Sequence, residues 1–367
     1  MNKFVNLGSW NDYKTLPLNL DCYPPIRLYN HNTLDQLNPY PIESSDRVMD
    51  MRKASEAHRI VRKYIQEYIK PQMKVEDICE KLENKTRELF PNNDQKSGIG
   101  FPTGFSINEC VAHDSPVPND KRIINKKDII KVDFGTHVNG NIIDSAFTIA
   151  WNPTYEPLLK ATEEATWSGI RMAGPDAVIS DISEEIQEVI ESHEINIKGK
   201  TYSVKAVKNL GGHDIEPYKI HGKTALILGA PHPAQKNMRM VANKCYAIET
   251  FVTAGDGAVG WAQNDMSLPT TLYSKIHDAP KTHLSLKSSK KLLNFINMKY
   301  GTLPFCTRWL TKDFGDYKFA LAQLVKNKLV HAYPPLSEKK GTLSAQTEHT
   351  IFLHDYGKEI LSIGPDY

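Results

Sequence analysis

The sequence predicts an α+β fold made of two similar halves, with a helical subdomain inserted near the C-terminus. Pairs of amphipathic helices recur about 104 residues apart, and each pair precedes chain with little helical signal, which indicates an internal duplication. An Asn-Gly turn between two apolar runs predicts a β-hairpin in the first half. Between residues 262 and 338 the pattern becomes helical again, which marks the insertion.

Composition restricts the class of protein. The 367 residues are 40% hydrophobic and 24% charged, as is typical of a soluble globular protein. A formal charge of +2 provides no general attraction to nucleic acid or membrane, and no run approaches eighteen apolar residues. The N-terminus lacks the apolar core of a signal peptide, and the five cysteines are scattered. We therefore expect a cytoplasmic protein with no membrane partner.

The chain divides into an N-terminal arm and one large domain. Residues 1–43 are rich in Pro, Asn and Tyr without a sustained period, and we expect an irregular arm there. The catalytic domain is expected at 44–367. Its helix pairs are predicted from the N-cap at Ser44-Ser45-Asp46 to Pro71, then at Val75–Leu89, Tyr155–Met172 and Ile179–Ser192.

Two aspartates lie in the predicted hairpin. With a two-residue loop at Asn139-Gly140, Asp133 and Asp144 share one face as diagonal neighbours, roughly 7–8 Å apart at Cα. Two half-buried like charges repel each other unless a proton or a cation lies between them. The pattern therefore suggests a metal site, although two strand-end aspartates facing solvent would produce the same pattern.

Other acidic and imidazole groups lie in predicted strands or beside glycines. His213 follows a Gly-Gly pair, Glu249 lies among apolar neighbours in a predicted strand at 244–253, and Glu348 lies in another predicted strand at 344–353. Singly, each has a structural explanation. Together with the two aspartates they provide four carboxylates and one imidazole, enough for two metal ions that share bridging oxygens. No HExxH or GxxxxGK[ST] motif occurs, which argues against a mononuclear zinc protease and a P-loop nucleotide fold.

The predicted insertion is basic. From Lys281 to Lys328 it holds ten Lys or Arg residues against two Asp. A solvated surface would account for this excess. A weak contact with RNA or another polyanion is the alternative.

Long, ordered segments resemble the type 2 methionine aminopeptidases, which are pita-bread metallopeptidases. The resemblance runs from about residue 50 to Tyr367 and includes the insertion. The segments that carry it are GFPTGFSINECVAH (100–113), DIIKVDFGTHVNGNIIDSAF (128–147), NLGGHDIEPYKIHGKT (209–224), YAIETF (246–251), FINMKYGTLPFCTRWL (295–310), AYPPL (332–336) and AQTEHTIFL (345–353).

This resemblance implies a pita-bread fold, with pseudo-twofold halves around a curved, mainly antiparallel sheet, and a dinuclear metal centre. Two divalent ions (cobalt, manganese, iron or zinc) would share Asp144 and Glu348. Asp133 would complete one ion, and His213 and Glu249 the other. A hydroxide activated by the two ions would attack the scissile carbonyl.

The resemblance also implies roles for the residues around the ions. Glu249 would shuttle a proton, His221 would contact the scissile amide, and His113 would steady the leaving group. Phe101, Ile220, His113, His221 and Tyr333 would bind the substrate. The implied reaction removes the initiator methionine from nascent chains when the second residue is small. We expect a monomer, with a weak ribosome or RNA contact through the basic insertion.

One departure and two alternatives accompany the resemblance. The family places another pocket histidine shortly after the YAIETF strand, and residues 261–270 contain none. An X-Pro peptidase of the same fold is one alternative, although such relatives carry a separate N-terminal domain. A non-catalytic scaffold that binds RNA or protein is the other, although such relatives lose metal ligands.

Overall fold

The computed structural model describes residues 28–31, 45–91, 95–260 and 268–366. Most of the arm expected at 1–43 lies outside the described residues, as do 261–267 at the start of the expected insertion. Within the described ranges, no helix has the length and apolar content needed to cross a bilayer.

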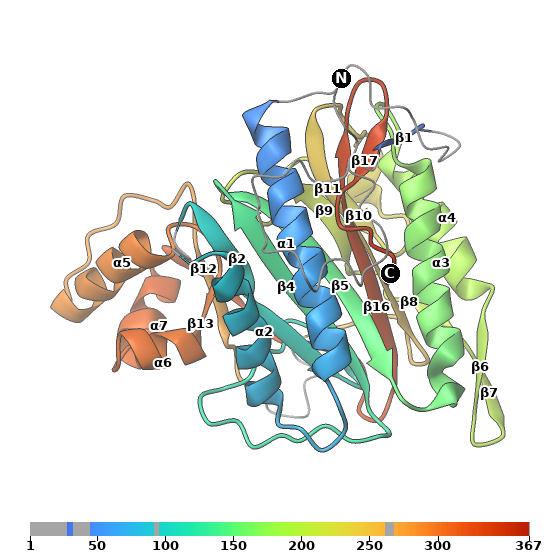
Figure 1. Ribbon diagram of the computed structural model, residues 1–367, viewed down its shortest axis with the longest axis horizontal. Helices are drawn as coiled ribbons and strands as arrows, with labels where there is room; N and C mark the ends of the chain where they lie inside the picture. The colour runs from blue at the N-terminus through green and yellow to red at the C-terminus, as the bar shows by residue number, and fades with distance from the viewer. Residues whose placement is uncertain (1–27, 32–44, 92–94, 261–267, 367) are drawn as a thin grey trace.

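Four long helices form two pairs on one side of the strands (Figure 1). They are α1 (Asp46–Tyr68), α2 (Val75–Leu89), α3 (Glu156–Met172) and α4 (Ile179–Glu191). The ends of α1 and α3 are 104 residues apart, and so are the starts of α2 and α4, which confirms the predicted duplication. Soon after α1 and α3 come Pro71 and Pro175, which cannot donate the next backbone hydrogen bond.

The two main sheets are antiparallel throughout. The first has the order β2-β4-β5, with β2 (Ser97–Ile107), β4 (Ile129–Val138) and β5 (Asn141–Ala150). The second has the order β1-β17-β16-β11-β9-β10, and β8 also pairs with β11. Its strands are β1 (Leu28–Tyr29), β8 (Lys205–Ala206), β9 (Gly211–Ile215), β10 (Leu226–Leu228), β11 (Lys244–Thr253), β16 (Ser344–Leu353) and β17 (Lys358–Ile360).

Hydroxyl side chains connect the two sheets where β5 lies against β16. Ser145 Oγ donates to the Glu348 carbonyl at 2.6 Å, and Thr148 Oγ1 donates to the Gln346 carbonyl at 2.8 Å. From the other strand, Thr350 Oγ1 donates to the Asp144 carbonyl at 2.5 Å. Helix α1 packs on β4 and β5, whereas α3 packs on β11 and β16. The result is an α+β pita-bread fold in which each helix pair covers one sheet.

The Asn-Gly hairpin has the predicted register, with Val138 opposite Asn141 and Asp133 opposite Ala146. Asn139 and Gly140 have φ of +48° and +77°, as a two-residue turn of this kind requires. Gly140 is needed for packing as well. A Cβ there would lie 2.2 Å from the ring of Tyr218, a residue that follows β9 and so joins the second half to this turn.

Three helices project from the two-sheet body (Figure 1). They are α5 (Lys287–Lys299), α6 (Thr307–Asp313) and α7 (Lys318–Lys326), and α6 was not expected from the sequence. Beside them lies a small sheet of β12 (Leu272–Lys275), β13 (Phe305–Cys306) and β14 (Val330–Tyr333). They have their own apolar core, which includes Leu292, Ile296, Phe305, Leu310 and Leu324. We retain the division into arm, catalytic domain and insertion at 262–338 as a proposal.

The remaining elements are short. Strands β3 (Cys110–Ala112) and β15 (Leu336–Ser337) pair with each other, as do β6 (Glu194–Ile197) and β7 (Lys200–Ser203). Single 3-10 turns occur at Pro153–Tyr155 and Pro233–Gln235. The pairing of β15 with β3 brings the end of the insertion back to the first half, next to His113.

Candidate metal centre

Five side chains converge from five strands onto one site. Asp133 and Asp144 come from the hairpin strands β4 and β5, and β5 lies beside β16, which carries Glu348. Glu249 on β11 pairs directly with Glu348. His213 on β9 pairs with Ala247, two residues before Glu249, so the alternation of side chains places all three groups on the same face.

The ligand atoms form two overlapping groups. Oxygen or nitrogen atoms of Asp144, His213 and Glu348 lie within 4.8 Å of one another, and so do those of Asp133, Glu249 and Glu348. Glu348 belongs to both groups. His213 Nε2 lies 3.6 Å from Asp144 Oδ2. These separations suit donors arranged around cations.

The centre is electrostatically unfavourable when only protein groups are considered. Burial raises the pKa of Asp133 to about 7. Burial, followed by repulsion from neighbouring carboxylates, raises the pKa values of Asp144, Glu249 and Glu348 well above their usual range. Burial lowers the pKa of His213 to about 4, so its ring is a neutral donor. Like charges directly opposite each other in a sheet are destabilising, as Glu249 and Glu348 would be without a cation.

The donor set fits divalent cations. Asp133 Oδ1 is buried and has no hydrogen-bond partner among the described residues. An unsatisfied buried carboxylate oxygen is costly, and coordination to a cation would satisfy it. Four carboxylates with one imidazole match the preferences of manganese, iron, cobalt and zinc ions.

Donor atoms of Glu249 lie close to those of Asp133 and Glu348. The pairing of Glu249 with His213 on one ion, which the resemblance implies, stays a prediction. Gln346 contacts two of these carboxylates, since its Nε2 donates to Glu249 Oε1 at 2.6 Å and to Asp133 Oδ2 at 3.4 Å. The amide therefore holds these two carboxylates on the same side of the centre.

Histidine and tyrosine rings form a wall next to the carboxylates. The ring of His213 lies 4.4 Å from that of His221, which lies 5.6 Å from the ring of Tyr333. The His113 ring is 5.7 Å from that of Tyr333. Tyr333 is fixed by a 2.9 Å hydrogen bond between its hydroxyl and Ser274 Oγ.

The histidines of this wall are neutral near pH 7. Burial lowers the pKa of His113 to about 4. Loss of surrounding water, and then repulsion from His213, lowers the pKa of His221 well below its usual range. His221 nevertheless keeps an exposed side. His113 has a φ of +64°, a conformation that is uncommon for a residue with a side chain and frequent at functional sites.

An apolar cluster lies beside this wall. Phe101 and Ile220 pack in one cluster with Ile142, Ala247 and Leu303. Phe101 crosses directly over Gly135, where a Cβ would lie 2.3 Å from the Phe101 ring. A side chain at position 135 would therefore displace the aromatic ring. The structure thus places Phe101 and Ile220 together and brings Tyr333 close to His113 and His221.

Two residues near the site were missed in the sequence. Gln346 precedes Glu348 by two positions on β16, and His331 precedes Tyr333 by two positions on β14. The His331 ring lies 4.6 Å from the Tyr333 ring. Side chains two positions apart in a strand share a face. Both residues could therefore have been predicted as the ones two positions before Glu348 and Tyr333.

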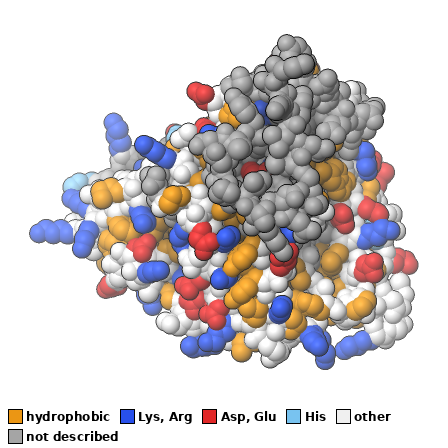
Figure 2. Space-filling model, in the orientation of Figure 1, with side chains coloured by type: hydrophobic (Ala, Val, Ile, Leu, Met, Phe, Trp, Pro, Cys, Tyr) orange, Lys and Arg blue, Asp and Glu red, His pale blue; other side chains and the backbone are white. Residues whose placement is uncertain are grey.

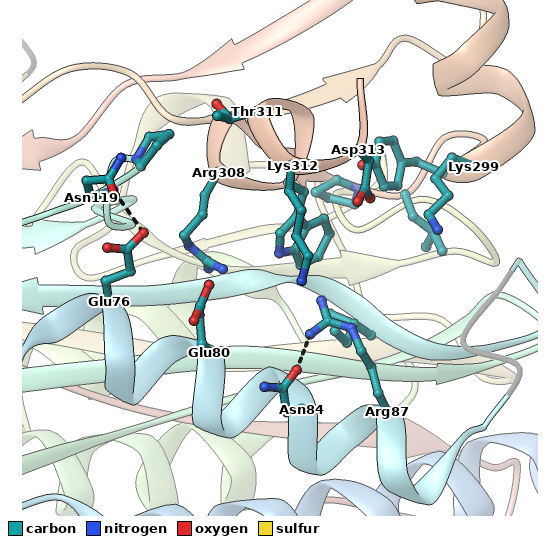
Figure 3. A pocket seen from close by; sticks show the side chains of 16 residues that line it. Glu76, Glu80, Asn84, Arg87, Asn119, Lys299, Arg308, Thr311, Lys312 and Asp313 are labelled. Carbon is teal, nitrogen blue, oxygen red and sulfur yellow. Dashed lines mark hydrogen bonds between the residues drawn. The ribbon is translucent and has the colours of Figure 1, made fainter. Parts of the chain in front are cut away.

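A separate pocket of about 500 Å³ lies between α2 and α6, away from the carboxylates (Figure 3). Its wall contains Arg308, Trp309 and Arg87, which surround the buried carboxylate of Glu83. Arg308 Nη2 donates to Glu83 Oε1 at 2.6 Å and Trp309 Nε1 donates to Glu83 Oε2 at 2.8 Å. These contacts attach the inserted helices to the first half.

A model of metallopeptidase family M24 matches residues 49–268. Methionine aminopeptidase 2 of Schizosaccharomyces pombe is 45% identical over 329 residues, which cover 89% of this chain and 75% of that protein. Methionine aminopeptidase 2 of Saccharomyces cerevisiae (strain YJM789) is 42% identical over 374 residues, which cover 98% of this chain and 84% of that protein.

Solved structures with the same fold are more distant in sequence. A thermophilic Arx1 has a TM-score of 0.74 at 19% identity, covering 88% of this chain and 92% of that chain. A methionine aminopeptidase from Thermotoga maritima has a TM-score of 0.57 at 19% identity, covering 88% of this chain and 99% of that chain. At this identity the two structures support the fold alone.

Proposed function

This chain belongs to metallopeptidase family M24 and is a metal-dependent methionine aminopeptidase, and we propose that the acidic centre is its catalytic site. The reaction removes the initiator methionine of nascent proteins. The observation that carries the proposal is the convergence of Asp133, Asp144, His213, Glu249 and Glu348 into two overlapping groups of donors.

We assign two divalent ions to these five residues, with Glu348 contributing to both groups. When bound, such ions supply Lewis acidity and lower the pKa of a water molecule in the centre. Cobalt, manganese, iron and zinc ions all suit a donor set of four carboxylates and one imidazole. Gln346 keeps Glu249 and Asp133 in position, and the hydroxyl of Thr350 fixes the backbone at Asp144.

Three side chains handle protons and the departing amine. Glu249 uses Oε1 to accept from Gln346, which leaves Oε2 to carry a proton between water and the leaving nitrogen. His221, whose ring lies against that of the proposed ligand His213, would contact the scissile amide. His113 faces the same region across Tyr333 and steadies the leaving group as a neutral imidazole.

Substrate choice follows from an apolar cluster next to a charged centre. Phe101, Ile220 and Tyr333 bind the methionine side chain, because a flexible thioether suits an apolar slot. A free α-amine can ligate a divalent ion, so only the first residue of a chain enters in the correct register. The preference for a small second residue would follow if the histidine wall borders that residue.

The test uses purified protein stripped of metal with a chelator. Adding manganese or cobalt should restore release of Met from the peptide Met-Ala-Ser, and elemental analysis should find two ions per chain. Asp144→Asn should abolish the restored activity. Absence of release with cobalt, manganese, iron and zinc would refute the function. Cleavage of Ala-Pro in preference to Met-Ala would indicate an X-Pro peptidase instead.

We also propose a weak RNA contact through the insertion. Nine of the ten Lys and Arg residues between Lys281 and Lys328 are exposed, and Lys and Arg side chains extend from the inserted helices in Figure 2. Arg308 is the exception, since it is buried and bonded to Glu83. Binding to a structured RNA should weaken steeply as salt rises, and salt-independent binding would argue against the contact.

Location and oligomeric state belong to the same proposal. A cytoplasmic location agrees with a nascent-chain substrate and with the four described cysteines, all of which are free thiols. We propose a monomer, which light scattering of the purified protein would check.

A further inference from the structure

His331, at the solvent-exposed end of the histidine wall, has no part in the function proposed above. His331 lies on β14, two positions before Tyr333, and its ring meets the Tyr333 ring edge-on at 4.6 Å. Unlike His113 and His213, His331 is exposed. After burial, repulsion from His331 is among the lesser causes that lower the pKa values of His113 and His221, which agrees with its ring contact to Tyr333.

Strand geometry relates His331 to the peptide substrate. In an extended peptide the side chains of the first and third residues point to the same side, about two strand residues apart. Tyr333 and His331 have the same relation on β14. If Tyr333 borders the slot for the first residue, His331 therefore borders the position of the third.

Distances agree with this placement. The ring of His221, beside the scissile bond, lies 5.6 Å from Tyr333, and Tyr333 lies 4.6 Å from His331. Added together, the His221–Tyr333 and Tyr333–His331 ring separations are no longer than about three residues of extended chain. The second residue of the substrate would remain next to His221, and the third would reach His331 as the peptide leaves toward solvent.

The chemistry of the wall favours an acidic side chain at that position. Among the described residues, no carboxylate forms an ion pair with His331. The side chains around it are imidazoles, the phenol of Tyr333 and Ser274, which lies opposite His331 on β12. An imidazole N–H is thus available to donate to a carboxylate on the substrate.

We propose that His331 is a specificity residue that contacts the third residue of the substrate and favours Asp or Glu there, an inference that rests on the proposed methionine aminopeptidase site. Neither the fold nor the metal centre requires this contact, since Tyr333 is already fixed by Ser274. A sequence with another side chain at position 331 would retain the reaction and lose the preference.

The experiment compares three amidated substrates, Met-Ala, Met-Ala-Ser-Ser and Met-Ala-Asp-Ser, with metal-loaded protein. Met-Ala amide ends before the third position and reports the reaction without the contact. His331→Ala should lower kcat/KM for the Asp peptide about fivefold, mainly through KM, and leave Met-Ala amide unchanged. His331→Gln, which keeps an N–H donor, should retain part of the preference. His277→Ala changes another exposed histidine of the same subdomain and should have no effect.

The outcomes separate the two proposals. An equal loss on all three substrates would mean that His331 acts only by supporting Tyr333, and unchanged selectivity in His331→Ala would mean that there is no contact. Either result overturns the inference and leaves the proposed function intact. Failure of the unmodified protein to cleave Met-Ala amide would refute both.

Discussion

Two buried glutamates of this protein, each at the centre of a polar cluster, have pKa values shifted in opposite directions. Glu83 on α2 and Glu348 on β16 are 0% and 1% exposed. Burial alone would raise the pKa of Glu83, but Arg308 reverses this and holds its pKa below the usual range. The pKa of Glu348 is raised well above that range by burial, with repulsion from Asp144 and Glu249 adding to it.

The groups around each glutamate indicate which of the two sites needs an external cation. Around Glu83 the chain itself provides Arg308, Arg87 and the indole N–H of Trp309. Around Glu348 it provides three more carboxylates and a neutral imidazole. The first cluster is complete and holds the insertion to α2, whereas the second is complete only with bound ions.

Glu83→Ala should produce the largest change in stability. Without the carboxylate, the buried Arg308 side chain loses its partner, and the free energy of unfolding should fall by about 3–5 kcal/mol. Urea unfolding followed by circular dichroism measures this change. Glu88→Ala on the same helix is the control, because Glu88 is largely exposed and should cost under about 0.5 kcal/mol. Equal effects of the two variants would contradict the assignment of Glu83 as a structural anchor.

Glu348→Gln should lower activity in the presence of metal and raise stability in its absence. Removing a shared ligand should lower kcat/KM by about a hundredfold or more, given that even outer partners of metal ligands cost ten- to a hundredfold. In metal-free protein the same change removes repulsion from Asp144 and Glu249, so the free energy of unfolding should rise. Kinetics with manganese and unfolding in chelator measure the two effects. A variant less stable than the original without metal would show that the centre is not strained by charge.

Local patterns made much of the fold and the site predictable. The Asn-Gly turn fixed the hairpin register, and hence the shared face of Asp133 and Asp144, because type I′ turns allow few alternatives. The repeated helix pair was recognisable since its two copies keep the same spacing between helix ends. Strands β11 and β16 have the bounds expected from the sequence, 244–253 and 344–353.

Contacts between distant segments were not predictable from such patterns. Arg308 counted toward the basic surface of the insertion, yet it is buried against Glu83, 225 residues away along the chain. Nothing local to either residue signals the pair. The grouping of Glu249 with Asp133 likewise depends on Gln346 reaching across from a neighbouring strand. A charged side chain that is buried and paired inside the protein cannot be distinguished, from the sequence alone, from one exposed on the surface.

Gln346→Leu should have a smaller effect than loss of a ligand. The substitution keeps the volume of the side chain but removes the amide that orients Glu249 and Asp133. Metal affinity should fall about tenfold, the lower end of what outer partners contribute. Isothermal titration with manganese measures it. Gln187→Leu, at a half-buried site on α4 outside the metal centre, should leave the affinity unchanged. An unchanged affinity in Gln346→Leu would mean that the two carboxylates are positioned by their strands alone.

The smallest expected effect is a difference in acid stability caused by Glu83. Its folded-state pKa lies below the ordinary glutamate value of about 4.5, so the folded protein holds fewer protons on Glu83 than the unfolded chain does as pH falls from about 4.5. The stabilisation is therefore fully present above about pH 4.5 and is lost as pH falls through the folded-state pKa.

The variant Glu83→Gln has no carboxylate at this position and so lacks this pH-dependent stabilisation. Its unfolding free energy should therefore fall less steeply below pH 4.5 than that of the original protein. The difference in unfolding free energy between the two proteins should therefore narrow as pH falls. Urea unfolding from pH 6 to pH 3 measures the gap, and acid release of metal affects both proteins alike because Glu83 lies outside the metal centre. Parallel curves would mean that Arg308 does not hold the carboxylate ionised, and the contrast with Glu348 would then lose its electrostatic basis.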